Sequence, residues 1–250
     1  LGGPSSGVLG EDGFIYTIPY NGFDKFYKVD TNTDTMEVIH TESVNYIGGV
    51  FARNKCIYSF PESGSVALKL NTETNEVSYI PISAVNSRGS VLTPSGKVYS
   101  IPYSGNIAVI DTNDDSTYSI TPAVDGGSSG ALAPNGKIYC APLKGSAILV
   151  IDTNDDTTDS ISVSTAYTGT ILAPNGKIYC AESGTLLEIN PEDNTATVTS
   201  IPEGKSFQEG VIAPNGKLYF ASWSGTIGVL PPASGTYSIP WATSSYYNKW

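Results

Sequence analysis

The stretch LAPNGKIYCAP at residues 132–142 returns as LAPNGKIYCAE at residues 172–182 and, more loosely, as IAPNGKLYF at residues 212–220. At its centre a tight turn is followed by a tyrosine, and this shorter element occurs throughout the chain. Recurrence at a fixed period indicates a repeat architecture. The elements are EDGFIY (11–16), RNKCIY (53–58), PSGKVY (94–99), PNGKIY (134–139), PNGKIY (174–179) and PNGKLY (214–219).

The spacing of the six tyrosines predicts the fold. They follow one another at steps of 42, 41, 40, 40 and 40 residues, and each repeat contains four short apolar or alternating runs bounded by turn residues. Four antiparallel strands in about 40 residues are the signature of a propeller blade. We therefore expect an all-β, six-bladed β-propeller with pseudo-symmetry, forming one domain over residues 1–250. The expected blades span approximately 7–46, 47–87, 88–128, 129–167, 168–207 and 208–250.

The turn of the repeated element has a clear local chemistry. Proline presets its own φ, and glycine accepts the positive φ that closes a hairpin. In the second repeat the turn reads Arg53-Asn54-Lys55, without glycine, and we expect Asn54 to take the left-handed conformation there. The six tyrosines are interpreted as packing between blades, each with a hydroxyl group that finds a partner.

The repeats resemble the YVTN-type propeller repeats, whose pattern is a PDG turn, a tyrosine and a later VIDT. The matching segments here are PNGKIYCA with LVIDT (149–153), and PSGKVYSI with AVIDT (108–112). The resemblance covers all six repeats and is weakest in the second and sixth. It implies a propeller and little about chemistry, since propellers host unrelated functions.

Composition excludes some classes of partner. The chain has 24 acidic and 13 basic residues, a net charge of −11, which repels phosphate backbones and anionic lipid. No apolar run approaches the roughly 20 residues of a membrane-spanning helix. We expect no nucleic-acid partner, no membrane partner, no cofactor and a monomeric protein.

Histidine- and cysteine-based catalysis is disfavoured. His40 is the single histidine, and it falls at the end of the fourth, outermost expected strand of the first repeat. Cys140 and Cys180 occupy equivalent second-strand positions, where other repeats have small or apolar residues, so we interpret both as packing residues.

The sequence offers two kinds of candidate metal site. The segments DTNTD (30–34), DTNDD (111–115) and DTNDD (152–156) resemble the opening of a calcium loop, but they lack its later glycine and glutamate, so turn chemistry is favoured over weak calcium binding. Hydrolases of the lactonase type are six-bladed propellers that hold a metal near their innermost strands. Here only Asp125 and Glu209 stand close to those strands, so a metal-dependent hydrolase is kept as an alternative.

The segments that differ between repeats are the candidate binding surface. Propeller geometry places the loops between second and third strands on the same face as the loops between blades, 83–89 among them. Exposed aromatic and polar side chains there suit sugar stacking or a protein partner, and the opposing interpretation is that they merely seal the rim. The candidate ligand-binding residues are Tyr20, Phe23, Tyr46, Arg88, Tyr103, Tyr167, Phe207, Gln208 and Trp223.

Three function classes stay open from the sequence. The favoured one is a non-enzymatic scaffold whose loop face recognises a protein or a carbohydrate. The alternatives are the metal-dependent hydrolase and a structural or engineered repeat scaffold without ligand.

Overall fold

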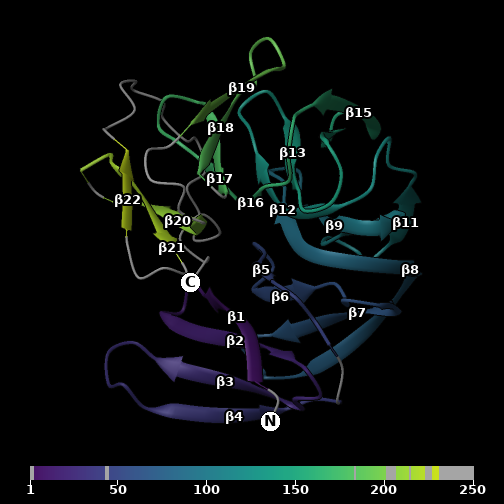
Figure 1. The fold of residues 1–250 in the computed structure, drawn as a ribbon. Coiled ribbons are helices and arrows are strands. Elements are labelled where there is room, and N and C mark those ends of the chain that lie inside the picture. The colour runs from purple at the N-terminus through teal and green to yellow at the C-terminus, as the bar shows by residue number, and fades with distance from the viewer. Residues whose placement is uncertain are drawn as a thin grey trace. The chain divides into compact units, whose positions relative to one another are not determined.

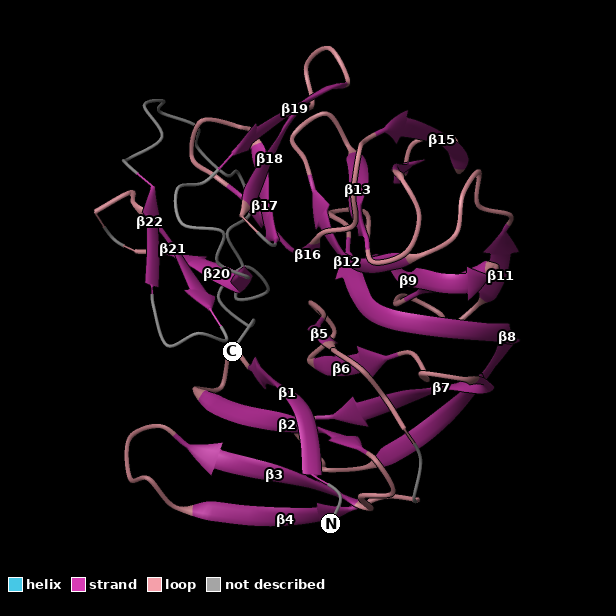
Figure 2. Cartoon of the chain, viewed as in Figure 1, coloured by secondary structure: helices cyan, strands magenta, loops and turns pink. Residues whose placement is uncertain are grey.

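The computed structural model describes residues 3–42, 45–182, 184–200, 207–213, 215–222 and 227–230. These residues form antiparallel strands joined by turns and contain no helix, hence none long and apolar enough to cross a membrane (Figure 2). The chain divides into two compact units, which are described separately: unit 1 holds the described residues up to Thr121, and unit 2 those from Pro122 onward.

Unit 1 begins with a four-stranded sheet whose strands follow one another in chain order (Figure 1). Its first two strands pair from Gly3 opposite Tyr20 to Leu9 opposite Ile15. The fourth strand is mostly exposed, which suits an edge strand. The strands are β1 (Gly3–Leu9), β2 (Phe14–Tyr20), β3 (Lys25–Asp30) and β4 (Met36–His40).

The second and third repeats of unit 1 share one seven-stranded sheet, because a single long strand, β8, belongs to both. The prediction of a loop at residues 83–89 was wrong, because this segment lies inside β8. It contains no tight-turn dipeptide, and the strand bends instead at register shifts between Asn86 and Ser87 and between Ser87 and Ser90. The strands are β5 (Val50–Phe51), β6 (Cys56–Ser59), β7 (Gly64–Asn71), β8 (Val77–Leu92), β9 (Lys97–Gly105), β10 (Ile107–Asp111) and β11 (Thr117–Ile120).

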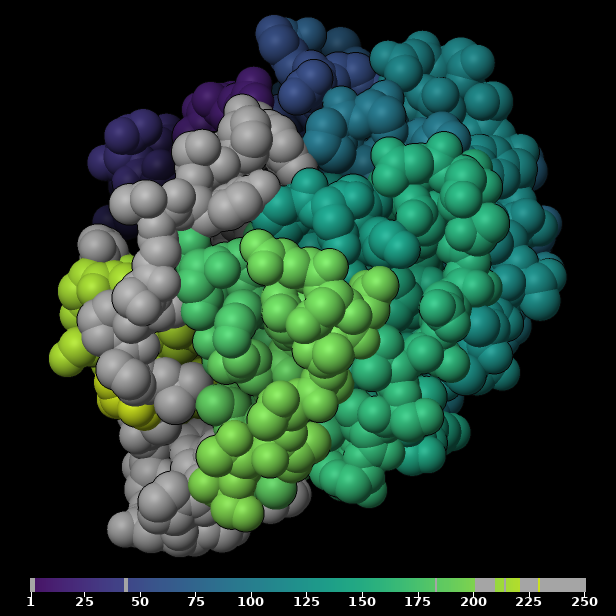
Figure 3. Space-filling view, turned by 90° about the horizontal axis from the view of Figure 1, so that it is seen from above, coloured from purple at the N-terminus to yellow at the C-terminus, as the bar shows by residue number. Residues whose placement is uncertain are grey.

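Unit 2 contains two complete four-stranded sheets and three described strands of a further one. In the space-filling view, β16 to β19 appear in green as one close-packed surface (Figure 3). The strands are β12 (Gly127–Leu132), β13 (Lys137–Pro142), β14 (Ala147–Asp152), β15 (Thr157–Ser162), β16 (Thr168–Leu172), β17 (Ile178–Glu182), β18 (Thr185–Asn190), β19 (Thr195–Ser200), β20 (Phe207–Ile212), β21 (Leu218–Ser222) and β22 (Ile227–Leu230).

The expected all-β fold of four-stranded antiparallel sheets is confirmed. The division into six blades within one domain is untested and stays a prediction.

Inner strands are buried on both faces because neighbouring repeats pack on either side of them. Ile57 belongs to the core that the second repeat shares with the first, where Val8, Ile18 and Phe26 also lie. The next residue, Tyr58, belongs to the core shared with the third repeat. Successive side chains of a strand point to opposite faces, so continuous apolar runs here follow from sandwiching between sheets.

The repeated element closes on itself through its asparagine. In the fourth repeat, Asn135 Oδ1 accepts from the Lys137 backbone N–H at 3.0 Å, and Asn135 Nδ2 donates to the Tyr139 hydroxyl at 3.0 Å. Asn54, Asn175 and Asn215 do the same: each accepts from the N–H two residues later and donates to the tyrosine of its own repeat, Tyr58, Tyr179 or Tyr219. In the first repeat the Tyr16 hydroxyl donates to Asp12. Tyr16, Tyr58 and Tyr139 are fully buried, and the expected hydroxyl partners are confirmed at these positions.

The same asparagine and tyrosine also fasten the fourth repeat to the fifth and the second repeat to the third. Asn135 Nδ2 donates to the Pro191 carbonyl at 2.7 Å, and the Tyr139 hydroxyl donates to Asn194 Oδ1 at 2.5 Å. Between the second and third repeats, Asn54 Nδ2 donates to the Thr112 carbonyl at 2.7 Å and the Tyr58 hydroxyl donates to Asp115 at 2.9 Å. Packing between repeats is thus accompanied by buried, satisfied hydrogen bonds. Burial raises the pKa of these tyrosines.

The second-repeat turn corrects one expectation. Lys55, with φ 60°, takes the left-handed conformation, not Asn54. Lys55 stands where the other repeats have glycine, such as Gly136 with φ 81°. Asn54 stands where they have the bonding asparagine, and its side chain is committed to Tyr58 and the Cys56 N–H. Position in the turn therefore decides the conformation more strongly than residue type.

We predict that Tyr139→Phe lowers the free energy of unfolding by about 1–2 kcal/mol, because it leaves Asn135 and Asn194 without their shared hydroxyl. This should lower Tm by a few degrees, measured by differential scanning calorimetry. The matched control is Tyr118→Phe, since Tyr118 is partly exposed and its hydroxyl accepts from Lys97 at the surface. Equal effects of the two changes would contradict the fastening role.

Candidate functional site

Four half-buried side chains of unit 1 form what we call the polar-aromatic cluster: Tyr20, Glu62, Arg88 and Tyr103. Arg88 Nη1 lies 3.1 Å from Glu62 Oε1, and the Tyr20 hydroxyl donates to the same oxygen at 3.3 Å. The Arg88 guanidinium carbon lies 4.8 Å from the centroid of the Tyr103 ring. Guanidinium groups stack well on aromatic faces, so one cation is held between a carboxylate and a ring.

Backbone pairing brings these four residues together from separate elements. Tyr20 ends β2, Arg88 lies in the second half of β8, and Tyr103 lies in β9, the antiparallel neighbour of β8. Glu62 lies between β6 and β7, where its N–H donates to the Asn45 carbonyl at 2.7 Å. The preceding Pro61 forms a bridge with Tyr46 and accepts from the Ser87 N–H at 3.2 Å. Glu62 is therefore fixed from both sides.

The cluster keeps hydrogen-bonding capacity that the protein does not use. Arg88 Nε is buried and has no partner among the described residues, and the same is true of Asn86 Oδ1, two residues earlier on β8. The Glu62–Arg88 pair is partly open to solvent, with side-chain exposures of 23% and 29%. A carboxylate offers four acceptor positions and a guanidinium five donors, so both groups can bind further partners. The cluster suits recognition of a polar ligand.

The structure unites three of the nine predicted residues, Tyr20, Arg88 and Tyr103, through a fourth that was not predicted. Glu62 lies in the PESG segment (61–64), which aligns with the PYSG segment (102–105) of Tyr103. A charged residue where a neighbouring repeat has an aromatic one was the available signal.

Tyr46 and Tyr167 correct the expectation of exposed aromatics, since they are 1% and 0% exposed. Each lies four residues before the partner of its motif tyrosine: Val50 pairs with Tyr58, and Ile171 with Tyr179. Their N–H groups donate to the carbonyls of Pro19 and Pro142 at the end of the preceding repeat's second strand. This pairing draws the rings inward between repeats, so they seal the junction and do not present a surface.

Ser87 stands at the corresponding position of the third repeat. It lies four residues before Val91, the partner of Tyr99, and its N–H likewise donates to Pro61. The Ser87 hydroxyl group lies within donating distance of two backbone carbonyl oxygens, that of Gly89 at 2.9 Å and that of Ile101 at 3.2 Å. The polar-aromatic cluster, with Arg88 next in sequence, therefore stands at a position without a sealing tyrosine. In the fourth repeat the same position is Gly127, four residues before the Ala131 partner of Tyr139.

Phe23 lies apart from the cluster. It follows the turn after β2, and its ring packs on Tyr27 at a centroid distance of 5.5 Å, with Lys25 Nζ 5.8 Å away. The remaining predictions fall outside what the structure describes: Trp223 altogether, and the side chains of Phe207 and Gln208, whose backbone lies in β20.

The aspartate-rich turns bind their own backbone. Asp30, Asp111 and Asp152 each accept from the N–H two residues later, at 2.8, 2.9 and 3.1 Å. Asn71 and Asn190 accept in the same way, without a charge. The turn interpretation is confirmed, since these oxygens face backbone donors. The N–H of Asn32 lowers the pKa of Asp30, and hydrogen bonds from Thr195 lower the pKa of Asp193.

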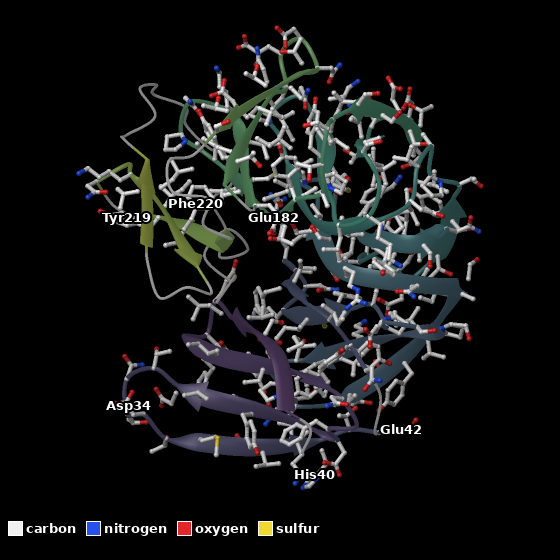
Figure 4. The ribbon with its side chains drawn as sticks, in the orientation of Figure 1. Asp34, His40, Glu42, Glu182, Tyr219 and Phe220 are labelled. Atoms are coloured by element: carbon white, nitrogen blue, oxygen red, sulfur yellow. The ribbon has the colours of Figure 1, made fainter. Side chains whose placement is uncertain are left out.

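The other candidate catalytic or metal-binding residues of the described chain do not gather in one place. Within the described part of the chain no three His, Cys, Asp or Glu side chains gather to hold a metal. His40 lies exposed at the end of edge strand β4, as expected, at the opposite end of the β3–β4 hairpin from Asp34 (Figure 4). Cys56, Cys140 and Cys180 are buried and form no disulfide, and burial raises the pKa of Cys56. Asp125 is exposed, and the side chain of Glu209 lies outside the described residues.

Comparison with known proteins identifies a family and a fold. The model of a family described as a domain of unknown function (DUF5074) matches residues 100–229. No curated protein matches the chain. A streptogramin B lyase structure is similar with a TM-score of 0.77 at 14% identity, covering 94% of this chain and 85% of the lyase.

Two further structures have the same kind of likeness. A catalytically inactive virginiamycin B lyase from Staphylococcus aureus has a TM-score of 0.77 at 12% identity, covering 92% of this chain and 84% of that one. A hydrazine synthase from Kuenenia stuttgartiensis has a TM-score of 0.75 at 14% identity, covering 93% and 77%. The virginiamycin lyase is a seven-bladed β-propeller, so the likeness shows a propeller-like fold and leaves the number of blades open.

We predict that Tyr46→Ala lowers the free energy of unfolding by about 3–5 kcal/mol, as for other buried aromatics, because it empties a junction between repeats. Tyr46→Phe should cost much less, since it loses only the hydroxyl bond to the Val66 carbonyl at 3.2 Å. Urea unfolding measures both. A small effect of Tyr46→Ala would show that the ring is not part of the core.

We predict that acid removes the contribution of the Asp30 turn to the free energy of unfolding. The pKa of Asp30 is lowered in the folded state, so its contribution is complete above the unfolded pKa of about 3.9 and is lost as pH falls through the folded value. The Tm difference between wild type and Asp30→Asn should therefore shrink below about pH 4. The difference for Asn71→Ala, at an uncharged turn, should not change with pH, and a parallel change in both would contradict this assignment.

Proposed function

Because the chain belongs to the DUF5074 family, a domain of unknown function, its role has to be inferred from its own surface, and we propose that it is a non-enzymatic recognition module. The ligand, a carbohydrate or a protein, docks on the polar-aromatic cluster of Tyr20, Glu62, Arg88 and Tyr103. Phe23, Phe207, Gln208 and Trp223 stay further candidate ligand-binding residues by their sequence positions.

One observation carries the proposal: a guanidinium stacked on a tyrosine and paired with a carboxylate, at a junction where a small residue replaces the sealing tyrosine. Binding sites combine aromatic carbon with a few convergent polar groups, and tyrosine and arginine dominate recognition energetics. The rest of the repeat is committed to holding strands and turns together. In this cluster, polar groups that can bind a further partner lie beside aromatic rings.

The architecture we propose for this role is a six-bladed propeller of YVTN-type repeats forming a single domain. The six motif tyrosines at steps near 40 residues support it, as does the likeness to propeller structures. Propellers present the segments joining their strands on one face, which places function in the residues that vary between repeats.

An enzymatic role is less well supported. The catalytically inactive Staphylococcus aureus lyase carries an alanine in place of a histidine, whereas the single histidine of this chain lies on an edge strand. A metal-dependent hydrolase would need converging ligands, and the described carboxylates of the turns face their own backbone. A scaffold without ligand is less favoured, because the Glu62–Arg88 pair is partly exposed beside two tyrosines.

The remaining partner assignments rest on charge. With a net charge of −11, we propose that the protein acts without nucleic-acid or membrane partners, as a monomer and without a cofactor.

We predict that Tyr103→Ala abolishes ligand binding while changing the Tm of the free protein by no more than a few degrees. A thermal-shift screen against neutral oligosaccharides, acidic oligosaccharides and a peptide library supplies the ligands, because a binder of the folded state raises Tm by mass action. Tyr118→Ala is the control, since Lys97 Nζ lies 5.1 Å over that ring in the same sheet, outside the cluster. Ligands that bind Tyr103→Ala normally, or no binder in the screen, would refute the recognition role.

A further inference from the structure

The polar-aromatic cluster offers a hydrogen-bond acceptor and a hydrogen-bond donor side by side. Glu62 Oε1 contacts Arg88 and Tyr20, and Oε2 is the second acceptor oxygen of the carboxylate. Arg88 Nη1 lies against Glu62 and Nε is buried without a partner, so a ligand would contact the remaining Nη donors of the guanidinium. A matching ligand must therefore donate to a carboxylate oxygen and accept from a guanidinium at neighbouring positions.

Two hydroxyl groups on adjacent carbons meet this requirement. Each hydroxyl donates one hydrogen bond and accepts two, so one can donate to Glu62 while its neighbour accepts from Arg88. A peptide amide offers the same groups only with its backbone extended along a strand edge. Around Arg88 and Tyr103, strands β8 and β9 pair only with each other, because the β7–β8 pairs end at Val85 and the β9–β10 pairs at Tyr99. A peptide bound at this edge is therefore an outcome that the test below has to distinguish.

The charges of the cluster favour an uncharged ligand. The formal charges of Glu62 and Arg88 cancel at 3.1 Å, which leaves no unpaired cation for an anionic ligand and no unpaired anion for a cationic one. An acidic ligand would also approach a protein with a net charge of −11. Breaking a partly buried pair to satisfy a charged ligand would cost more than using the donors and acceptors that it leaves open.

The aromatic rings fit the apolar face of a sugar ring better than an apolar protein anchor. Tyr20 and Tyr103 expose only part of their rings, and each carries a polar hydroxyl beside the charged pair. The large exposed hydrophobic residues of the described chain, Met36, Val38, Val66, Tyr118, Val198 and Val229, lie outside the cluster. A protein partner would need such anchors near the centre of its interface.

We infer that the polar-aromatic cluster binds a neutral pyranose sugar through two adjacent hydroxyl groups, with Glu62 accepting, Arg88 donating, and Tyr20 and Tyr103 packing against the C–H face of the ring. This inference rests on the proposed recognition function and specifies its ligand class. The sugar is held without covalent chemistry, so it leaves the site unchanged.

Isothermal titration calorimetry with neutral gluco-, xylo- and manno-hexasaccharides, and with oligogalacturonate of the same length, tests the inference. Wild type should bind at least one neutral hexasaccharide and bind the acidic one at least tenfold more weakly. Arg88→Lys keeps the charge but lacks the planar fork, and it should weaken neutral-sugar binding at least tenfold. Glu62→Gln makes the cluster cationic, and it should shift preference toward oligogalacturonate.

The outcomes separate the inference from the proposed function. Preference of wild type for oligogalacturonate overturns the neutral-sugar inference, and so does a neutral sugar whose affinity is the same in Arg88→Lys. If a peptide of the earlier screen depends on Tyr103 and no sugar binds, the recognition function stands and the sugar inference is wrong. Tyr118→Ala should bind as wild type does, and the Tm of each variant shows that loss of binding is not loss of folding.

Discussion

A buried tyrosine hydroxyl bonded to a turn asparagine is the interaction on which the rest of the structure depends. Asn135 shapes its own turn, orients Tyr139, and reaches with it to Pro191 and Asn194 in the next repeat. Local turn chemistry and packing between repeats are thus satisfied by the same atoms. Because the hydroxyl is buried, losing either partner would leave a polar group without compensation. This dual use explains why the same letters recur along the chain.

The candidate site lies at a junction between repeats where a serine stands in place of a buried tyrosine. At two junctions a tyrosine, Tyr46 or Tyr167, fills the space between repeats and leaves nothing for a ligand. At the junction of the second and third repeats a serine takes the position, and the next residue, Arg88, is held by Glu62 and Tyr103. The same position therefore holds a sealing ring in the second and fifth repeats and a serine beside the polar-aromatic cluster in the third.

The sequence predicted the fold well because period and turn chemistry are local signals. It predicted four-stranded sheets, buried motif tyrosines and backbone-bound aspartates such as Asp30. It failed where the outcome depends on register between repeats. Whether Tyr46 points outward or inward is decided by a bridge to Pro61 and a bond to Pro19, which leave no mark in the sequence. Glu62 was likewise missed, because its importance comes from Arg88, 26 positions later in the chain.

The continuous strand β8 has a consequence for how such a chain can diversify. In a repeat protein, duplication and shuffling act on single repeats that exchange freely when a flexible loop separates them. Val77–Leu92 is the outer strand of one repeat and the inner strand of the next, so no such seam exists between them. Replacing or deleting either repeat alone would therefore cut β8, so the two repeats can be exchanged only as a pair. Such an exchange would carry Glu62, Arg88 and Tyr103 together and leave Tyr20 behind in the first repeat.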